Sequence, residues 1–323
     1  MTPSATPGRT CPLSYHYGPA VFRQPVPAAL DDLDVLYVVG GLYGDEHALH
    51  EVLRLFDAER GRKQLVFNGD FHWFDADPAI FDRIQREVLS HIALRGNVET
   101  ELAQATPISD AGCGCAYPDW VDDAVVDRSN RILQRLWAAA TPAHRQQLAA
   151  LPMWQTARVG DMRVGLVHGD AQSLAGWGFA QEHLRQADHR DLVRPWFQQA
   201  DVDAFACSHT CLPVYQGLRR SGSARPAWIF NNGAAGMPNF QGDTAGLLTR
   251  IALTAYAGPH SRASLVQGQV HIDALAIDVP AAAVQQRFLA QWPAGSDAHA
   301  SYFARVSAGP AGYHPDHVIR QED

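Results

Sequence analysis

The chain has 323 residues, of which 46% are hydrophobic and 19% are charged, a composition typical of a globular protein with a large buried core. Its formal net charge of −8 comes without any run of Lys or Arg, which argues against nucleic acid or an anionic membrane surface as the main partner. No apolar stretch approaches the roughly 20 residues that span a bilayer, and residues 1–7 lack the pattern of a signal peptide.

The first 32 residues are rich in proline and polar side chains and predict an irregular N-terminal arm. Apolar runs then predict strands over 33–39, 65–67 and 92–95, separated by helical patterns around 49–56 and over 80–89. This alternation is typical of an α/β protein with a parallel sheet. In such sheets the reactive side chains lie at the carboxyl ends of the strands.

Residues from about 103 to 151 interrupt this alternation and predict a helical insert that caps the site. It holds a loop over 112–118, a helix capped by Asp119 that runs to about Ala140, and a shorter helix over 142–151. Short strands are expected over 155–159, 163–167, 204–207, 227–231, 247–254 and 270–277. We therefore expect one main domain over 33–280, followed by a C-terminal helix (281–292) and a poorly patterned tail that together form 281–323.

Four polar motifs each follow a predicted strand. They are Asn68-Gly69-Asp70, Gly96-Asn97-Val98-Glu99, Val167-His168-Gly169-Asp170 and Ser208-His209-Thr210-Cys211. Any one of these motifs is common at the end of a strand, whereas all four in this order form a specific pattern.

In order and spacing the motifs resemble those of the calcineurin-like metallophosphoesterases, most of all the compact bacterial branch, over residues 33 to 255. The later segment Asn231-Asn232-Gly233 resembles a loop that follows the last ligand in that family, which supports the register. The resemblance implies a four-layer α-β-β-α sandwich of two mixed sheets flanked by helices. It also implies hydrolysis of a phosphomono- or diester by a metal-activated water.

The resemblance assigns one complete metal site, and with it the catalytic role, to Asp70, Asn97, His168 and His209. One carboxylate, one amide oxygen and two imidazoles suit Mn, Fe or Zn. Glu99 matches an acidic position of the family. Asp170 is expected to orient one of the imidazoles.

The family's other metal site is depleted here, because Gly41, Tyr43 and Cys211 replace an Asp and two His. A Tyr43 phenolate and a Cys211 thiolate would still bind a soft ion, but we favour an empty site. Asp45 and His72 are further candidates near this half of the site, although a capping or surface role is more typical of each. Val98 is another departure, since many family members place a His there as a general acid.

Cys113 and Cys115 lie in the glycine-rich loop of the insert and would add two sulfurs to Cys211 if the insert folds over the cleft. The total of five cysteines is odd for a disulfide framework and favours a reducing cytoplasm. The leading hypothesis is thus a cytoplasmic phosphoesterase that acts on a small phosphorylated substrate. The alternatives are a non-hydrolytic, metal-binding or regulatory relative and an iron–thiolate redox site that uses Cys211. Neither the substrate nor the oligomeric state follows from the sequence.

Overall fold

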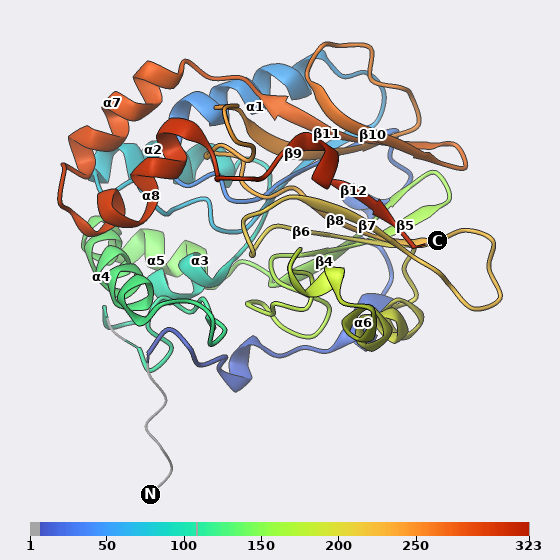
Figure 1. Cartoon of the computed structure of the whole chain (residues 1–323), viewed down its shortest axis with the longest axis horizontal. Coiled ribbons are helices and arrows are strands. Elements are labelled where there is room, and N and C mark those ends of the chain that lie inside the picture. The colour runs from blue at the N-terminus through green and yellow to red at the C-terminus, as the bar shows by residue number, and fades with distance from the viewer. Residues whose placement is uncertain (1–6, 108, 323) are drawn as a thin grey trace, which may run out of the picture.

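The computed structural model describes residues 7–107 and 109–322, and two six-stranded sheets pack face to face between helices (Figure 1). In sheet order, the strands of the first sheet are β10 (Ser261–Gln267), β11 (Val270–Ile277), β9 (Gly246–Ala252), β1 (Val35–Val39), β2 (Lys63–Asn68) and β3 (Ile92–Leu94). Those of the second are β12 (Ile319–Gln321), β7 (Val214–Leu218), β8 (Ala227–Asn231), β6 (Ala204–Cys207), β5 (Met162–Val167) and β4 (Trp154–Val159). The chain therefore has the expected four-layer α-β-β-α architecture.

Both sheets are mixed. Strands β1, β2 and β3 run parallel, whereas β9 is antiparallel to β1. In the second sheet β5, β6 and β8 run parallel, β4 is antiparallel to β5, and β7 is antiparallel to β8 but parallel to β12. The ends of the two sheets meet where the Asn68 side-chain amide donates to the Ala206 carbonyl across 3.3 Å. The loops that leave β2, β3, β5 and β6 are thereby brought to one edge of the sandwich.

Strand β1 shows why its sequence is a continuous apolar run. Leu36 and Val38 belong to the core between the two sheets, whereas Val35, Tyr37 and Val39 pack into the core beneath the helices. Because successive side chains of a strand point to opposite faces, a strand buried on both faces needs apolar residues at every position.

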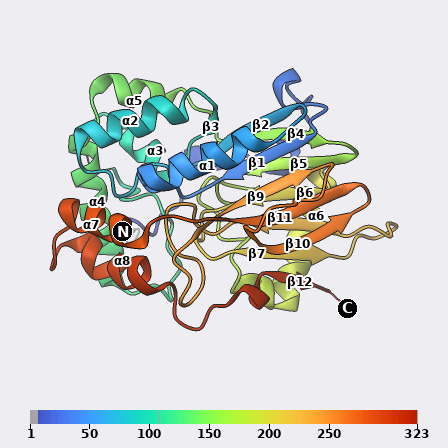
Figure 2. The same cartoon turned by 90° about the horizontal axis from the view of Figure 1, so that it is seen from above.

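The helices are unevenly placed around the sandwich (Figures 1 and 2). Their bounds are α1 (Glu46–Ala58), α2 (Pro78–Val88), α3 (Asn97–Leu102), α4 (Asp123–Ala139), α5 (Pro142–Ala149), α6 (Ala187–Ala200), α7 (Ala281–Gln291) and α8 (Asp297–Ala308). Helix α6 covers the outer face of the second sheet, and α1 covers that of the first. Helices α2 to α5, α7 and α8 gather at one end of the sheets, where the motif loops emerge. None of the helices in the described part of the chain is long and apolar enough to cross a membrane.

The described part of the N-terminal arm, residues 7–32, is irregular apart from three short 3-10 turns over Leu13–Tyr15, Pro19–Arg23 and Ala28–Leu30. Each turn buries one large apolar side chain, namely Tyr15, Phe22 and Leu30 respectively. Phe22 packs edge-on against Phe205 of β6, with the ring centroids 5.2 Å apart. The arm is therefore part of the folded body.

Several elements differ from the sequence-based predictions. The N-cap of α4 is Asp122 and not Asp119, because the Asp122 carboxylate accepts from the backbone N–H of Ala124. Helix α6 was missed because Pro195 lies inside it, and proline normally interrupts a helix. Helix α8 and strand β12 lie in the segment that lacked a clear apolar pattern, and both are stabilised by packing on other elements.

A buried ion cluster fixes the centre of the first sheet. The Arg250 side chain on β9 is 2% exposed and contacts Glu59 at 2.5 Å and Asp273 at 3.1 Å. A guanidinium between two carboxylates compensates charges that would otherwise be buried alone.

We expect Arg250→Met to lower the free energy of unfolding by about 3–5 kcal/mol, because it leaves two carboxylates without their cation. Urea denaturation followed by circular dichroism measures this loss. The matched control is Arg54→Met, which removes a more exposed pair with Glu51 and is expected to cost less than about 1 kcal/mol. Equal losses in both variants would contradict the role of Arg250 as the cation that compensates two buried carboxylates.

Candidate metal centre

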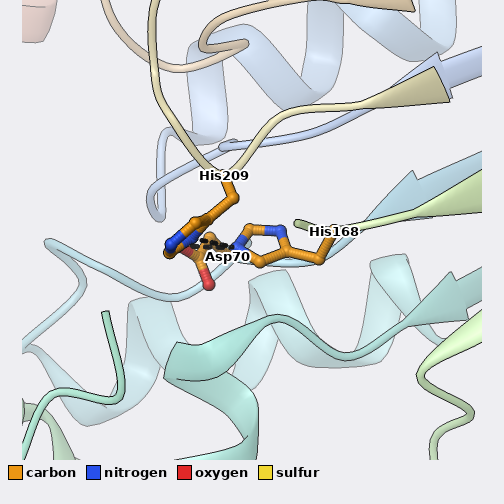
Figure 3. A group of neighbouring side chains, drawn as sticks. All are labelled: Asp70, His168 and His209. Carbon is orange, nitrogen blue, oxygen red and sulfur yellow. Dashed lines mark hydrogen bonds and ion pairs between the residues drawn. The ribbon is translucent and has the colours of Figure 1, made fainter. Parts of the chain in front are cut away.

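The four predicted ligands all lie just beyond the carboxyl end of a strand. Asp70 comes two residues after β2, His168 directly follows β5, and His209 comes two residues after β6. Asn97 follows β3 and begins α3, a short helix that the sequence did not reveal. Figure 3 shows the side chains of Asp70, His168 and His209 turned toward one another.

Their polar atoms converge on one point. His168 Nε2 lies 3.3 Å from Asp70 Oδ2, 3.1 Å from Asn97 Oδ1 and 3.1 Å from His209 Nδ1. All four residues are buried. Among the described residues, Asp70, His168 and His209 are the group of three or more His, Cys, Asp or Glu side chains whose ligand atoms are close enough to hold an ion.

The outward-facing atoms of these side chains fix which atoms point inward. His168 Nδ1 faces the Asn68 carbonyl at 3.0 Å and His209 Nε2 faces the Cys115 carbonyl at 3.1 Å, so we assign a proton to each of these nitrogens. The Asn97 amide nitrogen donates to the Cys113 carbonyl at 2.9 Å, which turns its oxygen toward the centre. In the neutral imidazoles the four inward atoms are therefore all acceptors. A cation is the partner that satisfies such a set, and a divalent metal ion fits it.

Two glycines permit this close approach. A Cβ atom at Gly96 would lie 2.2 Å from Asp70 Oδ1, and one at Gly69 would lie 2.7 Å from His168 Nδ1. Asp70 itself has a positive φ of 50°. Strained backbone of this kind is held only where the surroundings enforce it, and it is common at functional sites.

The charges in the cluster are coupled. Burial would lower the pKa of His168, but the Asp70 carboxylate reverses this effect and the net shift is upward. Burial would raise the pKa of Asp70, but the neighbouring His168 charge brings it below its ordinary value. Burial, reinforced by the His168 charge, lowers the pKa of His209 to about 3. His209 is therefore neutral at physiological pH, as a metal ligand must be.

Glu99 supports the site from behind. Its carboxylate accepts from the backbone N–H groups of Asp70 (2.8 Å), Gly96 (2.8 Å) and His72 (3.2 Å), and so ties two motif loops together. Burial, with a smaller contribution from the Asp70 charge, raises the pKa of Glu99 to about 7.

The three departures from the family pattern form one packed unit. The Tyr43 hydroxyl lies 2.9 Å from Cys211 Sγ, and a Cβ atom at Gly41 would lie 2.9 Å from the Tyr43 ring. The tyrosine ring thus fills the space that a side chain at position 41 would need. Burial raises the pKa of both Tyr43 and Cys211, which keeps the two groups neutral. At the depleted half of the predicted site, Tyr43 and Cys211 therefore contact each other and also border the cavity that includes Asp70.

The two further candidates near this half have other partners. The Asp45 carboxylate caps α1 by accepting from the backbone N–H groups of His47 and Ala48. The His72 ring stacks on Phe81 with centroids 3.7 Å apart, and its Nδ1 lies 2.5 Å from Asp75. Neither side chain belongs to the converging group.

Asp170 does not orient an imidazole, which corrects the expectation from the sequence. Its carboxylate accepts from the backbone N–H groups of Gln172, Ser173 and Gly178. These bonds fold the loop after β5. The backbone turns back directly after Gly169, and this turn places its N–H groups within hydrogen-bond distance of the Asp170 carboxylate.

The insert does fold over the centre, where two of its backbone carbonyls face the cluster and the Cys115 sulfur also accepts from the Asn97 amide at 3.4 Å. Cys113 and Cys115 present their backbone oxygens to Asn97 and His209. All five cysteines are free. Within the described chain, Cys113, Cys115 and Cys211 do not assemble into a group of metal ligands.

A cavity of about 260 Å³ opens beside the centre and includes Asp70 and His209 in its wall. Trp73 and Trp177 both line this cavity, although the sequence indicated no role for either. Ser301 and Tyr302 of α8 also line it and were missed altogether, because nothing in the sequence places the tail near residue 70. Arg95 donates to the Ala149 carbonyl and does not line the cavity.

The comparisons with known proteins support the fold. No protein-family model and no curated protein matches this sequence. A metallophosphoesterase from Sphaerobacter thermophilus superposes with a TM-score of 0.55 at 18% identity, over 86% of this chain and 100% of its own. A hypothetical protein from Pyrococcus horikoshii OT3 gives 0.57 at 12% identity, over 85% and 98% of the respective chains.

The chain has the metallophosphoesterase fold. At this level of identity the likeness establishes architecture, and the chemistry of the site has to be argued from its own residues.

We expect the protein purified without chelator to contain one transition-metal ion per chain, measured by elemental analysis. His168→Ala is expected to lose that ion, because it removes the atom on which the other three ligands converge. The matched control is His50→Ala on the exposed face of α1, which is expected to keep it. Two ions per chain would contradict the packing of Tyr43 into the depleted half.

Proposed function

We propose that this protein is a metal-dependent phosphoesterase that works with a single divalent ion. The convergence of four inward acceptor atoms, from Asp70, Asn97, His168 and His209, carries the proposal. Their outward atoms are each engaged by a fixed neighbour, so the ligand set is preorganised. The fold, shared with a metallophosphoesterase, agrees with this assignment.

A divalent ion held there would neutralise phosphoryl oxygens and lower the pKa of a bound water to roughly 7. The chain's own contribution is to place and shield this chemistry. His209 and His168 are held in one tautomer by backbone carbonyls, and Glu99 fixes the loop that carries Asp70. The cavity wall, with Trp177 among its residues, restricts access of bulk water.

The donor set of one carboxylate, one amide oxygen and two imidazoles suits Mn, Fe or Zn. The substrate that we propose is a small phosphorylated compound, because the cavity beside the centre has a volume of only about 260 Å³. The five free thiols agree with a reducing, cytoplasmic location.

The Tyr43–Cys211 contact favours a second candidate, a protein that binds one metal ion without hydrolysing phosphoesters. In this candidate the loss of one metal site has removed the chemistry and left the ligand cluster for regulation or binding. Turnover of a generic diester separates the two candidates.

We expect the Mn-, Fe(II)- or Zn-loaded protein to hydrolyse bis(4-nitrophenyl) phosphate. The reaction is measured by the absorbance of the nitrophenolate that is released. Asp70→Asn and His168→Ala should each lower kcat/KM by at least about 100-fold, since each removes a direct ligand. His50→Ala, on the exposed face of α1, serves as the control. Absence of turnover with all three metals would leave the non-hydrolytic candidate.

A second expectation concerns the leaving group. Val98 is 1% exposed, lines the cavity and has no proton to give. Hydrolysis should therefore depend strongly on how stable the leaving group is without protonation. We expect kcat/KM for 4-nitrophenyl methyl phosphate to exceed that for phenyl methyl phosphate by at least about 100-fold. Similar rates for the two would reveal a general acid elsewhere in the cavity.

A further inference from the structure

The cavity beside the metal centre is walled mainly by apolar and aromatic side chains. Besides the cluster residues, its wall includes Trp73, Val98, Tyr117, Val121, Val125, Trp177 and Tyr302. Trp177 packs edge-on against the His209 ring with centroids 5.6 Å apart, so the aromatic surface begins directly beside a metal ligand.

This aromatic surface continues outward. Trp177 also contacts the exposed Trp120, with ring centroids 6.1 Å apart. On another part of the wall, Trp73 and Tyr302 meet edge-on at 6.2 Å. Flat apolar groups pack well against surfaces of this kind. A cavity of about 150 Å³ accommodates benzene, so 260 Å³ is sufficient for one ring together with a phosphoryl group.

The wall contains no Lys or Arg among the described residues. Two guanidinium groups lie behind it, and both are engaged by other groups. Arg305 donates to the carbonyls of Cys211 and Pro238, and Arg128 donates to the Ser301 hydroxyl. Phosphomonoesters and polyphosphates carry two or more charges and are normally bound by such cations.

The net charge of the site also disfavours a ligand with two negative charges. A divalent ion beside the Asp70 carboxylate leaves a single net positive charge. A dianion would bring an uncompensated negative charge into an apolar cavity, at a large desolvation cost. A monoanion would not.

We propose that the cavity selects a phosphodiester with one negative charge and one flat, apolar ester group. This inference rests on the proposed function, since it names the substrate class of the same site. The apolar wall contacts the ester group and the metal centre receives the phosphoryl group.

The test uses three small anions that contain no ester bond, so binding is measured without turnover. Methylphenylphosphinate is a monoanion with a ring, dimethylphosphinate is a monoanion without one, and phenylphosphonate has a ring and two charges at about pH 8.5. Titration calorimetry with zinc-loaded protein should show methylphenylphosphinate binding at least about tenfold more tightly than either of the others. Equal or tighter binding of dimethylphosphinate or phenylphosphonate would overturn the proposal.

Two variants locate the selectivity in the wall. Tyr302→Leu should weaken methylphenylphosphinate about fivefold and leave dimethylphosphinate unchanged, with Tyr256→Leu, which lies outside the cavity, as the matched control. Val125→Lys adds a cation at a partly exposed position of the wall and should improve phenylphosphonate binding about tenfold. If Tyr302→Leu left methylphenylphosphinate binding unchanged and Val125→Lys left phenylphosphonate binding unchanged, the cavity wall would not determine the selectivity and the proposal would be refuted.

Failure of this inference is distinguishable from failure of the proposed function. Ring-selective binding of the phosphinate without hydrolysis of any diester would refute the hydrolase and support the ligand class. Hydrolysis of bis(4-nitrophenyl) phosphate without preference among the three anions would support the hydrolase and overturn the ligand class.

Discussion

Four acceptor atoms held around one point, with the donors of the same side chains turned outward, are the constraint on which the site depends. Neutral imidazoles that both donate outward to carbonyls leave two lone pairs facing each other at 3.1 Å between His168 and His209. That arrangement is unfavourable unless a cation lies between the atoms. In the function that we propose, a divalent metal ion is the cation that lies between these atoms.

This constraint explains features of the fold that lie outside the ligand set. The loops after β2 and β3 must approach closely, which requires glycine at positions 69 and 96. Glu99 ties the same two loops together through their backbone N–H groups. On the other side, the Asn231 side chain donates to the Thr210 hydroxyl and accepts from Gly233 N–H, which steadies the loop that carries His209. The sheets thus meet at an edge where backbone groups are satisfied by buried side chains.

The replaced residues of the depleted site behave as one substitution and not three. Gly41 leaves room for the Tyr43 ring, and Tyr43 and Cys211 contact each other. Both Tyr43 and Cys211 have positive φ values, 54° and 61°, so the backbone is strained on both sides of the contact. The Tyr43–Cys211 pair also borders the cavity that includes Asp70 and His209. Among the residues that the structure describes, the cavity wall contains no Lys or Arg, which agrees with the proposal of a single ion.

The sequence by itself predicted the order of the strands and motifs, because each motif directly follows an apolar strand and parallel strands bring their carboxyl ends to one edge. The four-layer sandwich and the four converging residues were implied by the resemblance of these motifs to those of the calcineurin-like metallophosphoesterases. Tertiary structure alone decided the rest. Asp170 was expected beside an imidazole but folds its own loop, since neighbouring backbone donors reach it first. Tyr302 of α8 lines the cavity, yet its segment has a weak apolar pattern and its position depends on packing against α4. Local patterns report contacts between near neighbours in the chain, whereas the walls of a site are set by segments far apart in sequence.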